Sequence, residues 1–128
     1  MIRAYFDSSA IFKLGCEETE TLALIDFLED EVREASTSVL AEVEVARNLR
    51  HRRLDQGEAV KGFHLITVDD EIRRTAIQLG DQSLRSLDAI HIASALAIGD
   101  RDLEFVTYDD RQAGAARRAG LKVVQPGR

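Results

Sequence analysis

The sequence has little of what a disulfide-stabilised, fibrous or membrane-spanning protein needs. Its 128 residues include one cysteine, one proline, eight glycines and no tryptophan. The lone cysteine, Cys16, excludes an internal disulfide and a cysteine-based zinc site, and it fits a reducing compartment. No apolar run approaches the roughly 18 residues of a membrane span, and the apolar stretch at the start is too short for a secretory signal. We therefore expect a cytoplasmic protein that does not enter a membrane.

The residues that are abundant are those of a folded globular chain. Hydrophobic residues make up 45% and charged residues 31% of the sequence, which excludes collagen-like, low-complexity and disordered chains. The length is typical of one domain, and we expect residues 1–128 to form a single domain. The net charge of −6 argues against nucleic-acid binding by bulk charge. It does not exclude a nuclease, because divalent cations held by clustered carboxylates restore the attraction for phosphate.

Apolar runs along the chain predict short strands separated by helices. We expect strands over residues 2–6, 35–37, 63–68, 104–108 and 121–124. We expect helices over residues 10–14, 19–31, 39–54, 69–79, 87–98 and 109–119, with Ser38 and Ser86 as N-caps. Their apolar faces should include Leu22, Ile25 and Leu28 in the second helix, and Val39, Leu40, Val43, Ala46 and Leu49 in the third. This alternation predicts an α/β protein whose central, mostly parallel sheet of four or five strands is covered by helices on both faces.

Four acidic residues lie where this arrangement brings strand ends and helix starts together. Asp7 ends the first strand, Glu44 lies in the third helix, Asp88 is in the first turn of the buried fifth helix, and Asp109 follows the fourth strand. The carboxyl ends of parallel strands form the ligand crevice, so these positions can converge. Converging carboxylates need raised pKa values or a hard cation such as Mg²⁺ or Mn²⁺. Taken singly, Asp7 and Asp109 could instead cap helices, and Asp88 could complement a helix dipole.

Helical periodicity leaves the choice between Glu42 and Glu44 open. Side chains two positions apart point roughly 200° apart around a helix axis, so only one of the two can face a common site. The neighbours of each glutamate at helical spacing do not decide which one it is.

Four segments form an ordered set of motifs, namely DSSAIFKL at residues 7–14, TSVLAEVEVAR at 37–47, LRSLDAIHIASAL at 84–96 and FVTYDDRQAGAARRAGLKVV at 105–124. Together they resemble the PIN-domain ribonucleases, and within them the VapC-type toxins of prokaryotic toxin–antitoxin pairs. In the second motif of that family a Leu precedes the acid by four residues and an Arg follows it by three, so the resemblance selects Glu44 through Leu40 and Arg47. The chain departs from the family pattern at Gln112, where an apolar residue is usual, and at Asp110, a second acid beside Asp109.

The resemblance implies a PIN-like three-layer fold and a metal-dependent endoribonuclease that hydrolyses RNA phosphodiester bonds. It implies that Mg²⁺ or Mn²⁺, as one ion or two, is bound by the metal-site and catalytic acids Asp7, Glu44, Asp88 and Asp109, with the Thr107 hydroxyl beside them. It further implies a VapB-type antitoxin as partner and a homodimer. The side chains that could form the antitoxin surface, or equally the core, are Phe12, Leu14, Ile25 and Leu28.

Other polar residues near the four acids carry weaker signals. Ser8 and Ser9 lack a nearby His in the sequence pattern, so water is the expected nucleophile and the two serines should cap the helix. His91 is expected to be a partly buried structural imidazole rather than a ligand or general base. The dense basic run at Arg47, Arg50, Arg52 and Arg53 either guides an RNA backbone or forms a solvated helix face.

Three alternatives stand beside the nuclease. A receiver-type signalling domain also gathers acids around magnesium, but it usually has paired acids after its first strand and a Lys after its last, whereas Asp7 is alone and Lys122 opens the final strand. A haloacid-dehalogenase-type phosphatase would have an Asp at position 9, where this chain has Ser9. A PIN fold retained as a non-catalytic interaction module is disfavoured by the presence of all four acids.

Overall fold

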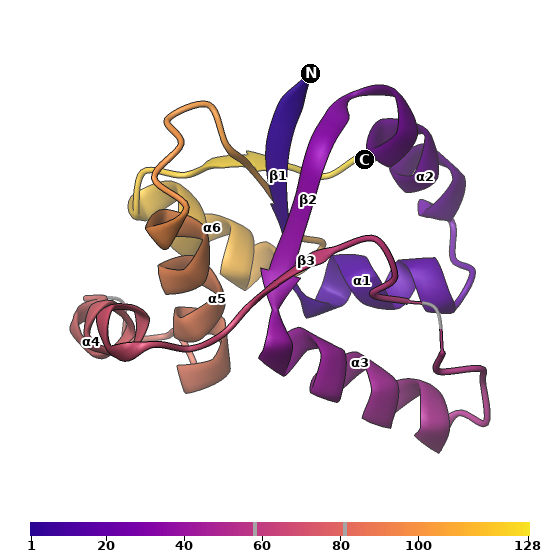
Figure 1. Ribbon diagram of the computed structural model, residues 1–128, viewed down its shortest axis with the longest axis horizontal. Coiled ribbons are helices and arrows are strands. Elements are labelled where there is room, and N and C mark those ends of the chain that lie inside the picture. The colour runs from indigo at the N-terminus through magenta and orange to yellow at the C-terminus, as the bar shows by residue number, and fades with distance from the viewer. Residues whose placement is uncertain (58, 81) are drawn as a thin grey trace.

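A parallel sheet of five strands forms the centre of the described chain (Figure 1). The computed structural model describes residues 1–57, 59–80 and 82–128. The strands are β1 (Ile2–Phe6), β2 (Val32–Ser38), β3 (His64–Ile66), β4 (Glu104–Val106) and β5 (Lys122–Val124). Their order across the sheet is β3-β2-β1-β4-β5, and each neighbouring pair is parallel. The predicted α/β class with a mostly parallel sheet is confirmed.

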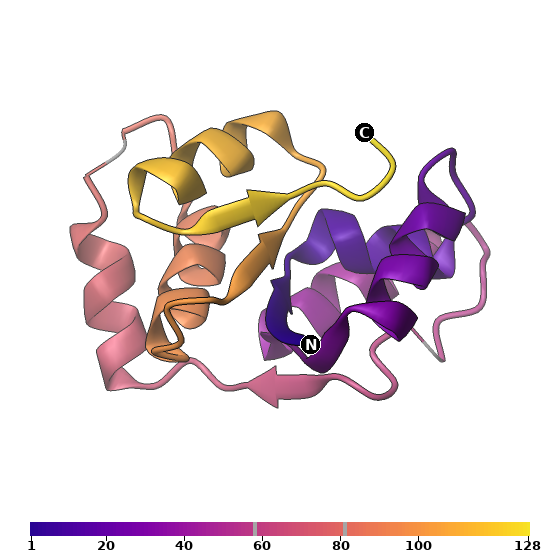
Figure 2. The same ribbon diagram turned by 90° about the horizontal axis from the view of Figure 1, so that it is seen from above.

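Helices cover both faces of this sheet. Those in the described residues are α1 (Ser8–Gly15), α2 (Thr21–Asp30), α3 (Val39–His51), α4 (Asp70–Gln78), α5 (Ser86–Ala97) and α6 (Asp110–Arg118). Figures 1 and 2 show α1, α2 and α3 on one side of the sheet and α4, α5 and α6 on the other. Successive side chains of β1 serve the two sides in turn, because Ala4 and Phe6 pack in the core under α1–α3 while Tyr5 packs in the core under α5 and α6. The expected three-layer arrangement is therefore present.

The carboxyl ends of β1, β2 and β4 meet at one edge of the sheet. Tyr5 is in register with Ser36 of β2 and with Phe105 of β4. The chain then leaves β1 at Asp7, whose N–H donates to the carbonyl oxygen of Val106 at 3.1 Å. Because all three strands run in the same direction, α1, α3 and α6 begin at this edge, and the residues at their starts are neighbours.

Several element boundaries differ from the sequence-based expectation. The second strand spans seven residues rather than three, because β1 pairs with it from Val32 to Ser36 and β3 pairs with it from Ser36 to Ser38. Ser38 caps α3 as predicted, accepting from the N–H of Leu40 at 3.1 Å. Ser86 does not cap α5, because it is the first residue of that helix and Arg85 occupies the N-cap position.

The buried faces of α2 and α3 also differ from the predicted ones. Leu22 is 70% exposed and Val43 is 55% exposed. The residues that face the core are Thr21, Leu24 and Phe27 in α2 and Ala41, Val45 and Leu49 in α3. Both helices carry apolar residues on more than one face, so periodicity alone did not identify the face that meets the sheet. Phe12, Leu14 and Leu28 are partly buried against this same core.

None of the helices in the described part of the chain is long and apolar enough to cross a membrane.

The two valines of α3 provide a matched test of its orientation. Val45 is 2% exposed and Val43 is 55% exposed. We expect Val45→Ala to lower the free energy of unfolding by about 1.5–3 kcal/mol, because a buried side chain is truncated. We expect Val43→Ala to change it by less than about 0.5 kcal/mol. Urea denaturation of both variants measures the difference, and equal losses would contradict the orientation of the helix.

Candidate functional site

Asp7 is the acid at the centre of the sheet edge. Asp7 is only 4% exposed to solvent. One carboxylate oxygen accepts from the Ala10 N–H at 3.1 Å and from the Ser9 hydroxyl at 2.6 Å, so Asp7 caps α1. The other oxygen accepts from the Thr107 hydroxyl, which in turn accepts from the Asp109 N–H at 3.1 Å. Thr107 thus ties the turn before α6 to Asp7.

Burial dominates the electrostatics of Asp7. It raises the pKa of the Asp7 carboxyl above its ordinary value, although the hydrogen bonds from Ser9, Thr107 and Ala10 oppose the shift. A carboxylate that is held against this penalty binds a positive charge more readily, because a cation removes the cost of the buried negative charge.

Glu44 reaches the same edge from α3. Its Oε1 atom accepts from the Ser8 hydroxyl at 2.7 Å and lies 3.1 Å from Nε2 of His91. Burial raises the pKa of the Glu44 carboxyl, but the hydrogen bonds from His91 and Ser8 outweigh it, and the net pKa lies below the ordinary value. Glu42 is exposed. Of the two glutamates between which periodicity could not choose, Glu44 is therefore the one that faces the strand ends.

Asp88 and Asp109 complete the group, and a positively charged side chain connects them. Asp88 lies in the first turn of α5, and Asp109 caps α6 by accepting from the N–H groups of Arg111 and Gln112. Arg85 Nε lies 3.4 Å from an oxygen of Asp88, and its terminal nitrogen lies 4.0 Å from an oxygen of Asp109. The Arg85 charge also contributes to the lowered pKa of Glu44.

The structure brings the four predicted acids to one edge and links them through shared neighbours. Thr107 connects Asp7 with the turn at Asp109, and Arg85 lies among the other three acids. Among the described residues, no three Asp, Glu, His or Cys side chains stand close enough to form a ready-made metal cage. The donor set nevertheless fits a hard divalent cation, because each of the four acids offers carboxylate oxygens and Arg85 already shows that a positive charge is favoured there.

The remaining predicted site residues separate into two groups. Thr107 contacts Asp7 as expected. Arg47 is exposed and, in the described part of the chain, forms no hydrogen bond or ion pair with the four acids. It lines a cavity of about 650 Å³ together with Asn48, Arg50, His51 and Arg53. Asp110 is 87% exposed, so Asp109 is the acid of that pair that faces the site.

Sequence reasoning missed the hydrogen-bonding neighbours of the acids. Asp7, not Ser8 or Ser9, caps α1, and the two serines instead donate to Glu44 and Asp7. His91 is buried as expected but contacts Glu44. Arg85 was not singled out at all. Spacing along the sequence was the signal that could have found these neighbours. Ser8 and Ser9 directly follow Asp7. Arg85 and His91 lie three residues before and three residues after Asp88, at the start of one helix.

A groove leads away from the acids between α1 and α3. It has a volume of about 400 Å³ and is lined by Ser8, Ser9, Phe12, Lys13, Glu18, Glu44, Val45, Asn48 and Arg52. Glu44 and Asn48 of α3 and its C-cap residue Arg52 are spaced four residues apart, so they lie on one face of the helix. Asn48 also lines the basic cavity next to it. The acids are therefore joined by a continuous surface to the arginine-rich end of α3.

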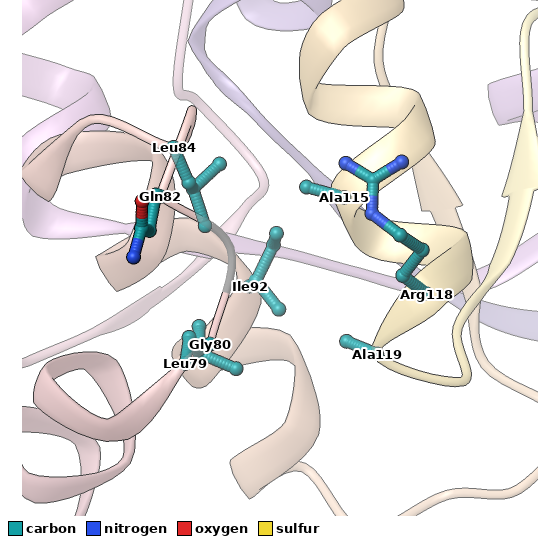
Figure 3. Close-up of a pocket in the computed structure, with 8 residues that line it drawn as sticks. All are labelled: Leu79, Gly80, Gln82, Leu84, Ile92, Ala115, Arg118 and Ala119. Atoms are coloured by element: carbon teal, nitrogen blue, oxygen red, sulfur yellow. The ribbon is translucent and has the colours of Figure 1, made fainter.

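A second hollow lies on the other side of the sheet, between α5 and α6 (Figure 3). Its volume is about 440 Å³, and it is lined by Leu79, Gly80, Gln82, Leu84, Ile92, Ala115, Arg118 and Ala119. Figure 3 shows Leu84 and Ile92 on one wall and Ala115 and Ala119 on the other. No carboxylate is among these described lining residues, so this hollow is separate from the acid group.

Comparison with known proteins identifies relatives along almost the whole chain. The PIN domain family model matches residues 4–118. Ribonuclease VapC46 of Mycobacterium tuberculosis is 39% identical over 98% of this chain and 99% of its own length. Ribonuclease VapC35 of the same organism is 38% identical over 96% of each chain.

Solved structures show the same fold. The crystal structure of Mycobacterium tuberculosis VapC20, described as a sarcin-ricin loop cleaving toxin, superposes with a TM-score of 0.75 at 16% identity over 96% of this chain and 99% of that one. A toxin–antitoxin complex from Klebsiella pneumoniae contains a chain with a TM-score of 0.73 at 23% identity, over 96% of this chain and 97% of that one.

The raised pKa of Asp7 predicts how stability depends on pH. A carboxyl whose pKa is higher in the folded than in the unfolded state binds more protons when folded, so the contribution of Asp7 to stability falls as pH rises from about 4 through its folded-state pKa. Asp7→Asn removes this ionisation. We expect the variant to be more stable than the wild-type protein at neutral pH without divalent metal, and the difference to shrink toward pH 4. Urea denaturation across this pH range measures it.

Asp110→Asn is the matched control, because the Asp110 side chain is 87% exposed. Its stability should follow that of the wild-type protein at every pH. A constant difference between Asp7→Asn and wild type from pH 4 to 7 would contradict the buried ionisation.

Proposed function

Because this chain belongs to the PIN-domain family, we propose that it is a divalent-metal-dependent endoribonuclease and the toxin of a VapBC-type toxin–antitoxin pair. The observation that carries the proposal is the convergence of Asp7, Glu44, Asp88 and Asp109 from separate segments on one sheet edge. The relatives described above are ribonucleases and toxins, which favours this function over a receiver-type domain, a haloacid-dehalogenase-type phosphatase or a non-catalytic module.

The four acids divide into two groups in the proposed site. Asp7, Glu44 and Asp88 hold the first ion, and Asp109 completes that site or holds a second ion. Mg²⁺ or Mn²⁺ bound there would polarise a phosphoryl oxygen, lower the pKa of a water molecule and stabilise the departing oxygen. Thr107 holds the Asp7 carboxylate in place through its hydroxyl hydrogen bond.

The groove between α1 and α3 supports a path for the RNA. It begins at Ser8, Ser9 and Glu44 and reaches Asn48 and Arg52. The adjoining basic cavity adds the guanidinium groups of Arg47, Arg50 and Arg53. A phosphate backbone that leaves the acids along α3 would therefore meet increasing positive charge, which compensates locally for the net charge of −6.

Partners and location follow from the same proposal. The antitoxin is a VapB-type protein, the toxin forms a homodimer, and residues 1–128 act as a single domain in the cytoplasm.

The four acids predict metal-dependent cleavage that single amide substitutions abolish. We expect the purified protein to cleave a mixed RNA pool in Mg²⁺ or Mn²⁺ and not in EDTA. Asp7→Asn, Glu44→Gln and Asp88→Asn should each lower the cleavage rate by more than about 100-fold, because removing a ligand should cost at least as much as removing its hydrogen-bonding neighbour. Gel analysis of the cleavage products measures the rates.

Two matched variants control for the change of charge. Glu42→Gln and Asp110→Asn remove exposed acids close in sequence to Glu44 and Asp109, and both should cleave at rates near that of the wild-type protein. Cleavage in EDTA would exclude the proposed site. Full activity in both of the single variants Asp7→Asn and Asp88→Asn would exclude it as well.

The toxin assignment predicts a phenotype that depends on the same acids. Induced expression of the chain in a bacterial host should halt growth, since uncontrolled RNA cleavage depletes essential RNA. Expression of Asp7→Asn to the same level should not, and co-expression of the cognate antitoxin should restore growth. Growth curves measure the effect. Arrest by Asp7→Asn equal to that by the wild-type protein would contradict toxicity through this site.

A further inference from the structure

His91 connects two sides of the molecule at the acid edge. It lies on α5, is 3% exposed, and has both ring nitrogens in contact with polar groups. Its Nδ1 atom lies 2.6 Å from the Tyr5 hydroxyl, and its Nε2 atom lies 3.1 Å from Oε1 of Glu44 and 3.0 Å from the Ser8 hydroxyl. A ring held at both nitrogens cannot rotate without breaking hydrogen bonds.

The contacts at Nε2 determine where the ring hydrogen lies. The Ser8 hydroxyl donates its single hydrogen to Oε1 of Glu44 at 2.7 Å, so its oxygen can only accept from His91. Glu44, as a carboxylate, can also only accept. Both neighbours of Nε2 therefore require a hydrogen on that nitrogen, since a bare Nε2 lone pair would repel the Glu44 oxygen.

The contact at Nδ1 completes the arrangement. In a neutral imidazole only one nitrogen carries a hydrogen, so Nδ1 accepts, and Tyr5 must be the donor. Tyr5 can be that donor because a phenol hydroxyl keeps its proton at neutral pH. The ring of Tyr5 is held in turn by stacking on Phe105, with centroids 5.5 Å apart.

We propose that Tyr5 and His91 are positioning residues that set the orientation of the Glu44 carboxylate for metal binding. The Tyr5 hydroxyl holds His91 in the Nε2–H tautomer, and that N–H together with Ser8 engages Oε1. Among the described residues, no recorded hydrogen bond reaches Oε2, so this second oxygen is the one presented to the cation. The role of Glu44 as a ligand rests on the proposed function, whereas the tautomer of His91 does not.

The tautomer is tested without metal or RNA. We expect the ¹⁵N spectrum of the wild-type ring of His91 to show a protonated Nε2 and an unprotonated Nδ1. In Tyr5→Phe the donor to Nδ1 is lost, and the spectrum should shift toward a mixture of the two tautomers. A wild-type ring protonated at Nδ1, whether or not Nε2 also carries a hydrogen, would overturn the proposal.

The effect on the metal site is tested by a double-mutant cycle in which calorimetry measures the affinity for Mn²⁺. A glutamine at position 91 can place an amide N–H close to Nε2, whereas an asparagine is too short to reach Glu44. We expect His91→Asn to weaken Mn²⁺ binding by about 10–100-fold and His91→Gln to restore most of it. Tyr5→Phe should weaken binding several-fold in the wild-type protein and have no effect in the His91→Gln background, because an amide has no tautomer to lock.

Tyr108→Phe is the matched control. It also removes a phenolic hydroxyl with a hydrogen bond, to the Pro126 carbonyl oxygen at 2.7 Å, but that bond does not involve His91 or Glu44. It should lower thermal stability without changing Mn²⁺ affinity. Equal losses of Mn²⁺ affinity from Tyr5→Phe in both backgrounds, or wild-type affinity in a folded His91→Asn variant, would overturn the proposal.

Failure of the proposed function gives a different result. A wild-type protein that neither binds Mn²⁺ nor cleaves RNA would refute the metal site, while the ¹⁵N spectrum alone would then decide the pairing of Tyr5 with His91.

Discussion

The gathering of carboxylates at one edge of a parallel sheet is the constraint on which the rest of the site depends. Asp7 is nearly inaccessible to solvent, and its charge would be costly to bury without compensation. The compensation comes from the hydroxyl groups of Ser9 and Thr107, which donate to Asp7, while the positive charge of Arg85 lies beside Asp88 and Asp109. The polar residues of this edge are therefore arranged around negative charge.

The same constraint links stability to function. Because burial raises the pKa of Asp7, the folded chain without a cation retains a destabilising group at its centre, a common property of active sites. Under the proposed function a divalent cation would relieve that penalty, so the carboxylate that weakens the fold would also be a ligand of the metal. The PIN-domain membership of the chain agrees with this arrangement, since the named relatives are ribonucleases.

The site also joins the two helical layers across the sheet. Glu44 belongs to α3 on one side, while Asp88 and His91 belong to α5 on the other. Tyr5 of the central strand packs on the α5 side and contacts His91, and His91 contacts Glu44. The orientation of a side chain on one layer is thus determined by a residue of the opposite layer, which local sequence cannot encode.

The sequence by itself determined the α/β class and the alternation of strands and helices, because burial patterns and strand ends are local features of the chain. It also nominated Asp7, Asp88 and Asp109 as candidate acids, while Glu44 was chosen over Glu42 only through the family motif. Only the tertiary structure decided that α3 turns Val45 and not Val43 to the core, that β2 extends to seven residues, and that Arg85 lies among the acids. It likewise decided that Ser8 and His91 form hydrogen bonds with Glu44 and that Ser9 donates a hydrogen bond to Asp7. These outcomes depend on which distant segment packs alongside, and periodicity within a segment carries no information about that partner.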